Sequence, residues 1–221
     1  MNTLELGGIR RAVIVAPHPD DELIAAFGLI RRLREQGTVV TVIVATDGAA
    51  SHRHSARFPP ARLAEVRRVE SRAGMARAGV SPHQVRFLGH ADGSLGEYGR
   101  AQRQALARDL GRGPTPDLLV LPSAIDDHPD HRCVARAGAA IWPRCPQRLA
   151  YVVWPIAGQP RPPARYALRL SDRLWHMKRS ALACHRTQAG LIDDDPSGFC
   201  ISREQRLRFT RPVERFVSPR L

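Results

Sequence analysis

Two short clusters of histidine and aspartate contain residue types that could bind a metal and transfer protons. The first is HPDDE at residues 18–22, between an apolar run at 12–16 and a helical pattern that starts at Leu23. The second is DDHPDH at residues 126–131, which follows the apolar run 118–121. Each cluster stands where a strand would end, and open α/β sheets hold ligands and catalytic groups at that edge. The pair of clusters therefore predicts a metal-dependent hydrolase.

The two clusters together supply a mixed set of metal ligands. His18, Asp21 and His131 offer two imidazoles and one carboxylate. Such a set suits a borderline-soft divalent metal, and three protein ligands leave one position for water in a hydrolytic zinc site. Asp20 would then be free to act as the base for that water, whose pKa a metal lowers to roughly 7. We expect Zn²⁺, with Fe²⁺ or another divalent metal as alternatives.

The second cluster also offers groups for the later steps of a hydrolysis. His128 lies three residues before His131, so both side chains could face one cavity. A protonated His128 could stabilise the oxyanion of a tetrahedral intermediate and then protonate a leaving amine. Asp130 could hold one imidazole in the required tautomer. The spacing does not distinguish His128 from His131 as the metal ligand.

Purely structural roles are the alternative for each cluster taken alone. Asp20 or Asp21 could be only the N-cap of the helix that follows. His128 and His131 could be ordinary histidines of a polar loop. The coincidence of two clusters, each after a predicted strand, favours the functional interpretation.

The rest of the sequence alternates strands with helices, which predicts a Rossmann-like, doubly wound, mostly parallel sheet with helices on both faces. Strands are predicted at 11–16, 38–46, 85–88, 117–121 and 148–154, and helices at 21–36, 61–78, 97–111, 134–141 and 172–188. In the strand order 3-2-1-4-5, strands one and four are neighbours. His18 and His128, 110 positions apart, would then face one cleft. A further strand is expected at 165–170, at an edge.

Size and composition fit a single domain over residues 1–221, with its core at about 11–188 and a tail at 189–221 that has no clear pattern. No apolar stretch approaches the roughly 18 residues of a membrane span. Residues 1–11 lack the basic and then apolar order of a secretory signal, so we expect a cytoplasmic protein. Four widely spaced cysteines suggest neither a zinc knuckle nor a disulfide framework. The oligomeric state is left open.

The net charge of +13 raises the alternative of a basic module that binds nucleic acid or a protein partner. Lys178 is the only lysine, so the basic residues are almost all arginines, and they are dispersed in runs no longer than two. Aromatic residues that could stack on bases are few. We therefore expect no nucleic-acid partner, although an acidic small substrate is compatible with the charge.

The two clusters and several segments between and after them resemble the N-acetylglucosaminyl-phosphatidylinositol de-N-acetylase family (PIG-L/LmbE-like). The resemblance covers about residues 11–188, and its paired HPDDE and HPDH motifs are the specific part. The matching segments are AVIVAPHPDDE (12–22), VATDGAAS (44–51), Arg67-x-x-Glu70 with Ala78-Gly79, FLGHADGSL (87–95), DLLVLPSAIDDHPDH (117–131) and KRSALACHRTQ (178–188).

The resemblance implies a zinc-dependent amidase that removes an acetyl group from an N-acetylglucosamine-type sugar or glycoconjugate. It implies His18, Asp21 and His131 as zinc ligands, Asp20 as general base, His128 at the oxyanion and Asp130 as a modulator of a histidine. It also implies substrate contacts from Arg67 and Asp92, although these two could form a plain ion pair. Departures from the family pattern at Ala50, Ala91 and Thr187 concern the substrate rather than the chemistry.

A non-haem iron oxygenase is the enzymatic alternative, because two histidines and one carboxylate also form its metal site. That site usually presents H-x-D on a β-barrel. The motif at residues 18–21 is H-x-x-D and follows a predicted parallel strand, which favours the amidase.

Overall fold

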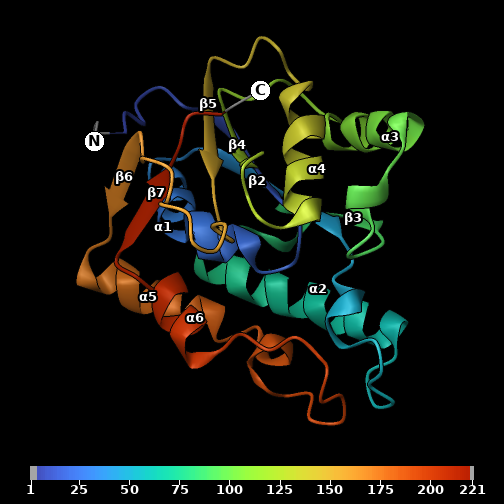
Figure 1. Cartoon of the computed structure of the whole chain (residues 1–221). Helices are drawn as coiled ribbons and strands as arrows, with labels where there is room; N and C mark the ends of the chain where they lie inside the picture. Colours follow the sequence, from blue (N-terminus) through green and yellow to red (C-terminus); the bar gives the residue numbers. More distant parts are fainter. Residues whose placement is uncertain (1–3, 220–221) are drawn as a thin grey trace.

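The computed structural model describes residues 4–219, and its centre is a sheet of five parallel strands (Figure 1). The strand order is β3-β2-β1-β4-β5, as predicted. The strands are β1 (Arg11–Ala16), β2 (Val39–Thr46), β3 (Val85–His90), β4 (Leu118–Pro122) and β5 (Gln147–Tyr151). β1 and β4 are direct neighbours, with Ala12 opposite Leu118 and Ile14 opposite Val120. The loops that follow these two strands therefore emerge side by side.

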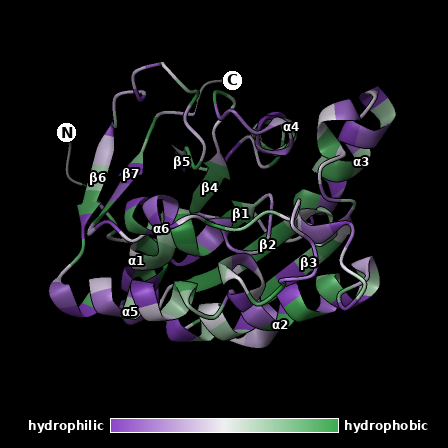
Figure 2. Ribbon diagram, turned by 60° about the horizontal axis from the view of Figure 1, so that its bottom comes forward, coloured by the Kyte–Doolittle hydropathy of each residue, from purple (hydrophilic) through white to green (hydrophobic). Residues whose placement is uncertain are grey.

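Alternation along the strands builds a hydrophobic core on each face of the sheet. In β1, Ile14 packs into one core, and Val13 and Val15 pack into the other. The first core is covered by α1 (Asp21–Glu35), α2 (Pro60–Arg77) and α5 (Asp172–Leu182), and the second by α3 (Arg100–Leu110) and α4 (Pro129–Ala139). Figure 2 shows the apolar strands between these two helical layers.

Three predicted helix boundaries are wrong by three residues or more, and one of them bears on the site. α4 begins at Pro129 rather than at residue 134, because proline suits the first helical turn and His128 caps the helix. The Nδ1 atom of His128 accepts a hydrogen bond from the backbone N–H of Asp130 at 3.2 Å. His131 therefore lies in the first turn of α4. In addition, α3 starts at Arg100 rather than at 97, and α5 ends at Leu182, followed by a separate 3₁₀ turn at Arg186–Ala189.

The predicted strand at 165–170 is not an edge of the main sheet. Its counterpart, β6 (Tyr166–Arg169), pairs antiparallel with β7 (Val213–Phe216) in a second, two-stranded sheet. A bridge between Val217 and Ala150 joins this antiparallel pair of strands to β5. The tail therefore supplies β7 and a further helix, α6 (Arg203–Phe209), both of which the sequence pattern left unassigned.

A buried ion pair forms hydrogen bonds with backbone groups on both sides of a kink in α1. Ala26 departs from helical geometry, with φ −140° and ψ 17°, so the backbone groups around it lose their helical partners. Lys178 Nζ donates to the carbonyl of Ile24 at 2.8 Å and to Glu214 Oε1 at 2.9 Å. The carboxylate of Glu214 in turn accepts hydrogen bonds from the N–H groups of Gly28 and Leu29, at 2.8 and 3.0 Å. Residues of α5 and β7 thus complete the hydrogen bonding of the helix that starts at Asp21.

Within residues 4–219, no helix combines the length and the apolar character needed to cross a membrane. The first three and last two residues of the predicted single domain lie outside the described residues.

Candidate metal centre and active site

Three donor atoms from the two clusters converge on one point at the carboxyl edge of the sheet. His18 lies in the loop after β1, Asp21 begins α1 and His131 lies in the first turn of α4. Asp21 Oδ2 lies 3.2 Å from His18 Nδ1 and 3.1 Å from His131 Nε2, and the two nitrogens are 3.3 Å apart. Ligands about 2.0–2.1 Å from a tetrahedral zinc ion are separated by roughly 3.3–3.4 Å. The triangle therefore fits an ion of this kind.

The other ring nitrogen of each histidine faces a carboxylate. His18 Nε2 lies 3.2 Å from Asp130 Oδ2 and 3.1 Å from Asp92 Oδ1. His131 Nδ1 lies 3.3 Å from Asp126 Oδ2, although the alignment is not that of a hydrogen bond. Carboxylates behind metal-binding histidines fix the ring orientation and raise the basicity of the ligand nitrogen.

Asp126 had no predicted role, yet it is fully buried and organises the second cluster. It accepts hydrogen bonds from the backbone N–H groups of His128, Val153 and Trp154, at 3.1, 2.8 and 3.1 Å. Its only signal in the sequence is its place at the start of the DDHPDH segment.

The carboxylate of Asp130 contacts His18 of the other cluster, whereas only its backbone N–H bonds to the neighbouring His128. Its carboxylate also accepts hydrogen bonds from the N–H groups of Gly93 and Leu95, at 2.8 and 3.0 Å. Asp92, predicted to touch substrate, lies beside the same His18 nitrogen and accepts from the N–H of Ala50 at 3.0 Å. The segment after β3 therefore contacts both clusters, through Asp92 to His18 and through two backbone N–H groups to Asp130.

The charges of the centre favour a cation. Burial opposes the charged form of His18, but hydrogen bonds to Asp130, Asp21 and Asp92 outweigh it and raise its pKa well above the usual value. Burial likewise opposes the charge on His131, but the negative charge of Asp21 and the contact with Asp126 raise its pKa to about 9. The pKa of Asp21 is lowered despite burial, chiefly by the charge of His131. A divalent cation would supply the positive charge that protons otherwise bring.

Two further groups of donors are close enough to be considered as metal ligands. The atoms of His18, His128 and His131 lie within 4.8 Å of one another, and so do those of His18, Asp92 and Asp130. The ring of His128 is 4.7 Å from that of His18 and 5.1 Å from that of His131, centroid to centroid. In the second group, His18 Nε2 lies 3.1 and 3.2 Å from the carboxylates of Asp92 and Asp130, so these contacts are as short as those of the triangle of His18, Asp21 and His131.

Asp20 has a strained backbone and no capping role. It stands before α1, but its side chain forms no cap hydrogen bond, and its φ of 139° is one that L-residues rarely adopt. Its Oδ2 atom lies 3.2 Å from Arg67 Nη2 at the wall of the cavity. Burial raises the pKa of Asp20 to about 8, although the nearby Arg67 opposes this shift. Its carboxylate is free of the metal triangle and faces the space beside it.

Arg67 braces the loop that carries Asp20. From α2 its guanidinium donates to the carbonyl of Pro19 at 2.7 Å and to the carbonyl of Gly48 at 2.8 Å. Gly48 has φ +70°, and a Cβ there would lie 2.6 Å from Arg67 Nη1, so the close approach requires glycine. Arg67 is therefore partnered within the protein, and it also lines the cavity.

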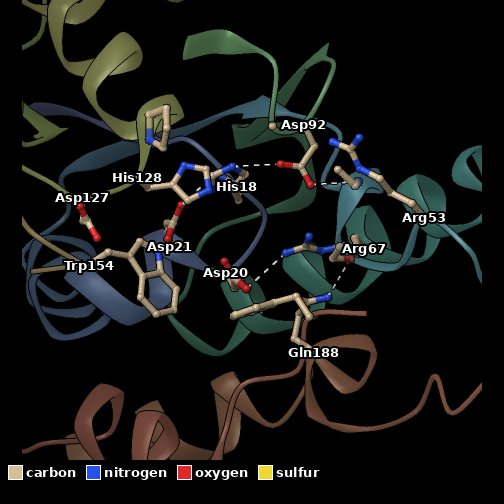
Figure 3. Close-up of a pocket in the computed structure, with 15 residues that line it drawn as sticks. His18, Asp20, Asp21, Arg53, Arg67, Asp92, Asp127, His128, Trp154 and Gln188 are labelled. Carbon is tan, nitrogen blue, oxygen red and sulfur yellow. Dashed lines mark hydrogen bonds and ion pairs between the residues drawn. The ribbon is translucent and has the colours of Figure 1, made fainter. Parts of the chain in front are cut away.

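A cavity of about 580 Å³ opens over the centre. Figure 3 shows His18, Asp20, Asp21 and His128 around it, with Trp154 on one side and Arg53 on the other. Its lining also includes Arg53, Asp127, Trp154, Gln188 and Phe199, none of which was among the predicted site residues. The rings of Trp154 and Phe199 meet edge to face at 5.9 Å. Phe199 belongs to the unassigned tail, so no sequence signal could have placed it there.

The tail segment that carries Phe199 is fastened to the loop after β2. Asp194 Oδ2 accepts from the N–H of Arg57 and Asp195 Oδ2 from the N–H of His54, each at 2.9 Å. The N–H of Phe199 donates to the carbonyl of Ser51 at 2.6 Å. This wall of the cavity therefore combines two segments that lie far apart in the sequence.

His185 lies near the centre but outside the cavity lining. It is 2% exposed, and neither ring nitrogen has a hydrogen-bond partner among the described residues. Burial, assisted by the charge of Arg67, lowers its pKa to about 3. His185 is therefore a neutral core residue.

Both clusters lie within a segment that matches a known protein family. The model of the family described as GlcNAc-PI de-N-acetylase (PIG-L) matches residues 13–142, which include both clusters. The chain is 25% identical over 201 residues to a probable N-acetyl-alpha-D-glucosaminyl L-malate deacetylase 2 of Bacillus cereus, covering 84% of this chain and 87% of that protein. It is 29% identical over 168 residues to 2'-N-acetylparomamine deacetylase of Streptomyces fradiae, covering 67% of this chain and 58% of that protein.

Among solved structures, the N,N'-diacetylchitobiose deacetylase from Pyrococcus horikoshii has the same fold. It superposes with a TM-score of 0.70 over 95% of this chain and 83% of that protein, at 21% sequence identity. The likeness extends well beyond residues 13–142 and includes most of the C-terminal part of the sequence.

Proposed function

The chain belongs to the GlcNAc-PI de-N-acetylase (PIG-L) family, and on this basis we propose that it is a metal-dependent N-deacetylase of N-acetylated sugar conjugates. The relatives named above, deacetylases of amino-sugar compounds, support this substrate class.

One observation carries the proposal. His18 Nδ1, Asp21 Oδ2 and His131 Nε2 form a triangle with edges of 3.1–3.3 Å, and the carboxylate of Asp20 stands beside it in the cavity. Three ligands with a free carboxylate next to them form the arrangement that metal-assisted hydrolysis requires. We propose these three residues as the ligands of a divalent ion, with zinc as the first choice for two imidazoles and one carboxylate.

When bound, the ion supplies Lewis acidity, which lowers the pKa of water to about 7 and polarises a carbonyl oxygen. Asp20 accepts the proton of the attacking water. Arg67 holds the Asp20 carboxylate and the carbonyl of Pro19 in place, so the base does not need to reorganise during the reaction. Water addition to the amide carbonyl, followed by cleavage of the C–N bond as Asp20 returns the proton to the leaving nitrogen, yields acetate and a free amine.

His128 is proposed to stabilise the oxyanion. Its Nδ1 accepts the N–H of Asp130, so the neutral ring carries its proton on Nε2. This Nε2–H can donate to a developing negative charge without the ring being protonated. Asp92 and Asp130 orient His18, and Asp126 orients His131, so these three carboxylates are proposed as positioning residues.

The cavity has one polar side and one apolar side, and a sugar conjugate could contact both. Arg67 and Asp92 provide polar groups for sugar hydroxyls, whereas Trp154 and Phe199 provide an apolar face for the ring or its aglycone. All four cysteines are free thiols, which fits the reducing cytoplasm that we propose as the location.

The test is a measurement of metal content together with amine release. Purified protein should contain about one divalent ion per molecule and release primary amine from some members of a panel of N-acetylglucosamine conjugates. A chelator should abolish the release, and added zinc should restore it. A metal-loaded, folded protein that releases no amine from any N-acetylated sugar would contradict the proposal.

A further inference from the structure

A second cavity, of about 210 Å³, lies where β7 and α6 meet α1 and the segment after β5. In Figure 1, β7 runs beside α1 and close to β5. Four arginines line this cavity. Arg161 comes from the segment after β5, Arg208 from α6, Arg211 from the link between α6 and β7, and Arg215 from β7 itself.

The arginines are not neutralised by acids of the protein. None of their guanidinium groups forms an ion pair or a side-chain hydrogen bond with another described residue. Glu214 is the only acid among the described lining residues, and it is bound to Lys178 and to the N–H groups of Gly28 and Leu29. The ion pair of Lys178 and Glu214 is neutral as a whole. The four arginines therefore leave the cavity with four positive charges that no acid of its lining balances.

One of these arginines is also partly removed from water. The guanidinium of Arg208 lies 5.6 Å from the ring centre of Trp154 and 5.0 Å from that of Phe209. Its Nε atom is buried and has no hydrogen-bond partner among the described residues. Burial, together with the charges of the three other arginines, lowers the pKa of Arg161. Arg161, Arg211 and Arg215 are exposed, so water and salt screen much of the repulsion among the four cations, and a bound anion would offset the remainder.

We propose that this cavity binds a phosphate-type oxyanion. Planar guanidinium groups bind phosphate through paired, charge-assisted hydrogen bonds, which is why arginine is common at such sites. The volume of 210 Å³ accommodates a phosphate or pyrophosphate group and is smaller than a cavity for a drug-sized ligand, about 300–1,000 Å³. The concave shape favours a small anion over the extended backbone of a nucleic acid.

The anion site adjoins the proposed active site through Trp154. This residue lines the active-site cavity, whereas Arg208 stacks over its ring and Phe209 meets it edge to face at 5.4 Å. The oxyanion could therefore be a free ion or part of the aglycone of the sugar conjugate. An anion that is part of the aglycone rests on the proposed function, whereas a free anion does not.

Calorimetric titration of the metal-loaded protein with inorganic pyrophosphate tests the site. The Arg161→Gln/Arg211→Gln variant should bind pyrophosphate about tenfold or more weakly, because two of the four cations are lost. The matched control is Arg203→Gln/Arg206→Gln, which removes the same charge from exposed positions of α6 outside the cavity. Its affinity should change by less than about twofold at a fixed salt concentration near 0.15 M.

Three results would overturn the site. The first is that wild type fails to bind pyrophosphate, and the second is that the cavity variant binds it as tightly as wild type, as expected if pyrophosphate binds only at the metal. The third is an equal loss in both variants, as expected for unspecific charge attraction.

Kinetics distinguish the two sources of the anion. If the anion belongs to the substrate, the cavity variant should raise KM for N-acetylglucosamine 1-phosphate and not for a neutral methyl glycoside, with kcat unchanged. Unchanged KM for both compounds, with pyrophosphate binding lost, identifies a free anion. If wild type binds pyrophosphate but deacetylates no compound, the proposed function fails and the anion site stands.

Discussion

Glu22 holds the backbone of Asp20 in its strained conformation. Glu22 Oε2 accepts a hydrogen bond from the N–H of Asp20 at 3.0 Å, and Oε1 accepts one from Ser71 Oγ at 2.7 Å. The Glu22 side chain is fully buried, and Asp20 has a φ of 139°. A non-glycine residue in such a region costs roughly 1–3 kcal/mol and persists only when its surroundings impose it. Glu22 therefore positions the proposed base.

Replacement of Glu22 separates this positioning role from a general loss of folding. Glu22→Ala should lower kcat by about tenfold or more, since the base loses its fixed geometry. Glu22→Gln should retain most of the activity, because the amide oxygen still accepts the N–H of Asp20 and the Ser71 hydroxyl can reverse its role. Metal content and steady-state kinetics of both variants distinguish a positioning role of Glu22 from a general loss of folding. Equal kcat in Glu22→Ala and wild type would refute the positioning role.

The proposed ligand set predicts which variants lose metal. Asp21→Ala and His131→Ala should be isolated with little bound ion, because each removes one corner of the donor triangle. His128→Ala should keep its metal and lose about 100- to 1,000-fold in kcat, as for other oxyanion donors. Elemental analysis and kinetics of the three proteins provide the check. A metal-free His128→Ala beside a metal-loaded His131→Ala would exchange the two roles.

Asp20→Asn should keep the ion and lose activity by several orders of magnitude, because the amide cannot accept a proton. KM should change little, since the proposed role is in the chemical step. Asp127→Asn is a control at the same cavity, because Asp127 is exposed and lies outside the donor triangle. Metal loss in Asp20→Asn with retention in Asp21→Asn would show that the two carboxylates are exchanged.

The ion pair of Lys178 and Glu214 predicts a large effect on stability. Lys178→Met should lower the free energy of unfolding by about 3–5 kcal/mol, because the buried carboxylate and the carbonyl of Ile24 lose their partner. Glu35→Gln breaks a more exposed ion pair, between Glu35 and Arg31 of α1. This change should lower the free energy of unfolding by about 0.5 kcal/mol or less. Urea unfolding of both variants measures the difference. Equal losses would contradict the role assigned to the buried pair.

His185 predicts an acid-dependent loss of stability. Its pKa is lowered to about 3 in the folded protein, chiefly by burial, whereas the unfolded value is about 6.5. The unfolded protein therefore binds a proton first as the pH falls below about 6.5, and stability decreases until the folded pKa is reached. His185→Gln removes this contribution, which approaches about 1.4 kcal/mol per pH unit.

The measurement is urea unfolding of chelator-treated wild type and His185→Gln between neutral pH and the folded pKa. Arg67 and Asp21, the charged groups that act on His185, are present in both proteins, so the difference in slope belongs to His185. Parallel pH curves for the two proteins would refute the neutral, buried state of His185.

Local patterns were enough to predict the core of the fold. The apolar runs at β1, β2 and β4 and the helical spacing after Leu23 specified a parallel α/β sheet, and its order placed the two clusters together. These features depend on residues close in sequence, because side-chain periodicity reflects the geometry of a single strand or helix. The same reasoning proposed His18 and Asp21 as candidate ligands, since their residue types and their place after a strand are visible in the sequence, whereas only the resemblance to the family favoured His131 over His128.

The tertiary structure decided which groups meet across the protein. The contact of Asp130 with His18, the place of Asp126 behind His131 and the brace of Arg67 on Pro19 join residues from different loops. Likewise, β7 has no distinctive pattern of its own and becomes a strand by pairing with β6, and Phe199 reaches the cavity through contacts with the loop after β2. Periodicity carries no information about such partners, because their free energy comes from burial and hydrogen bonds between distant segments.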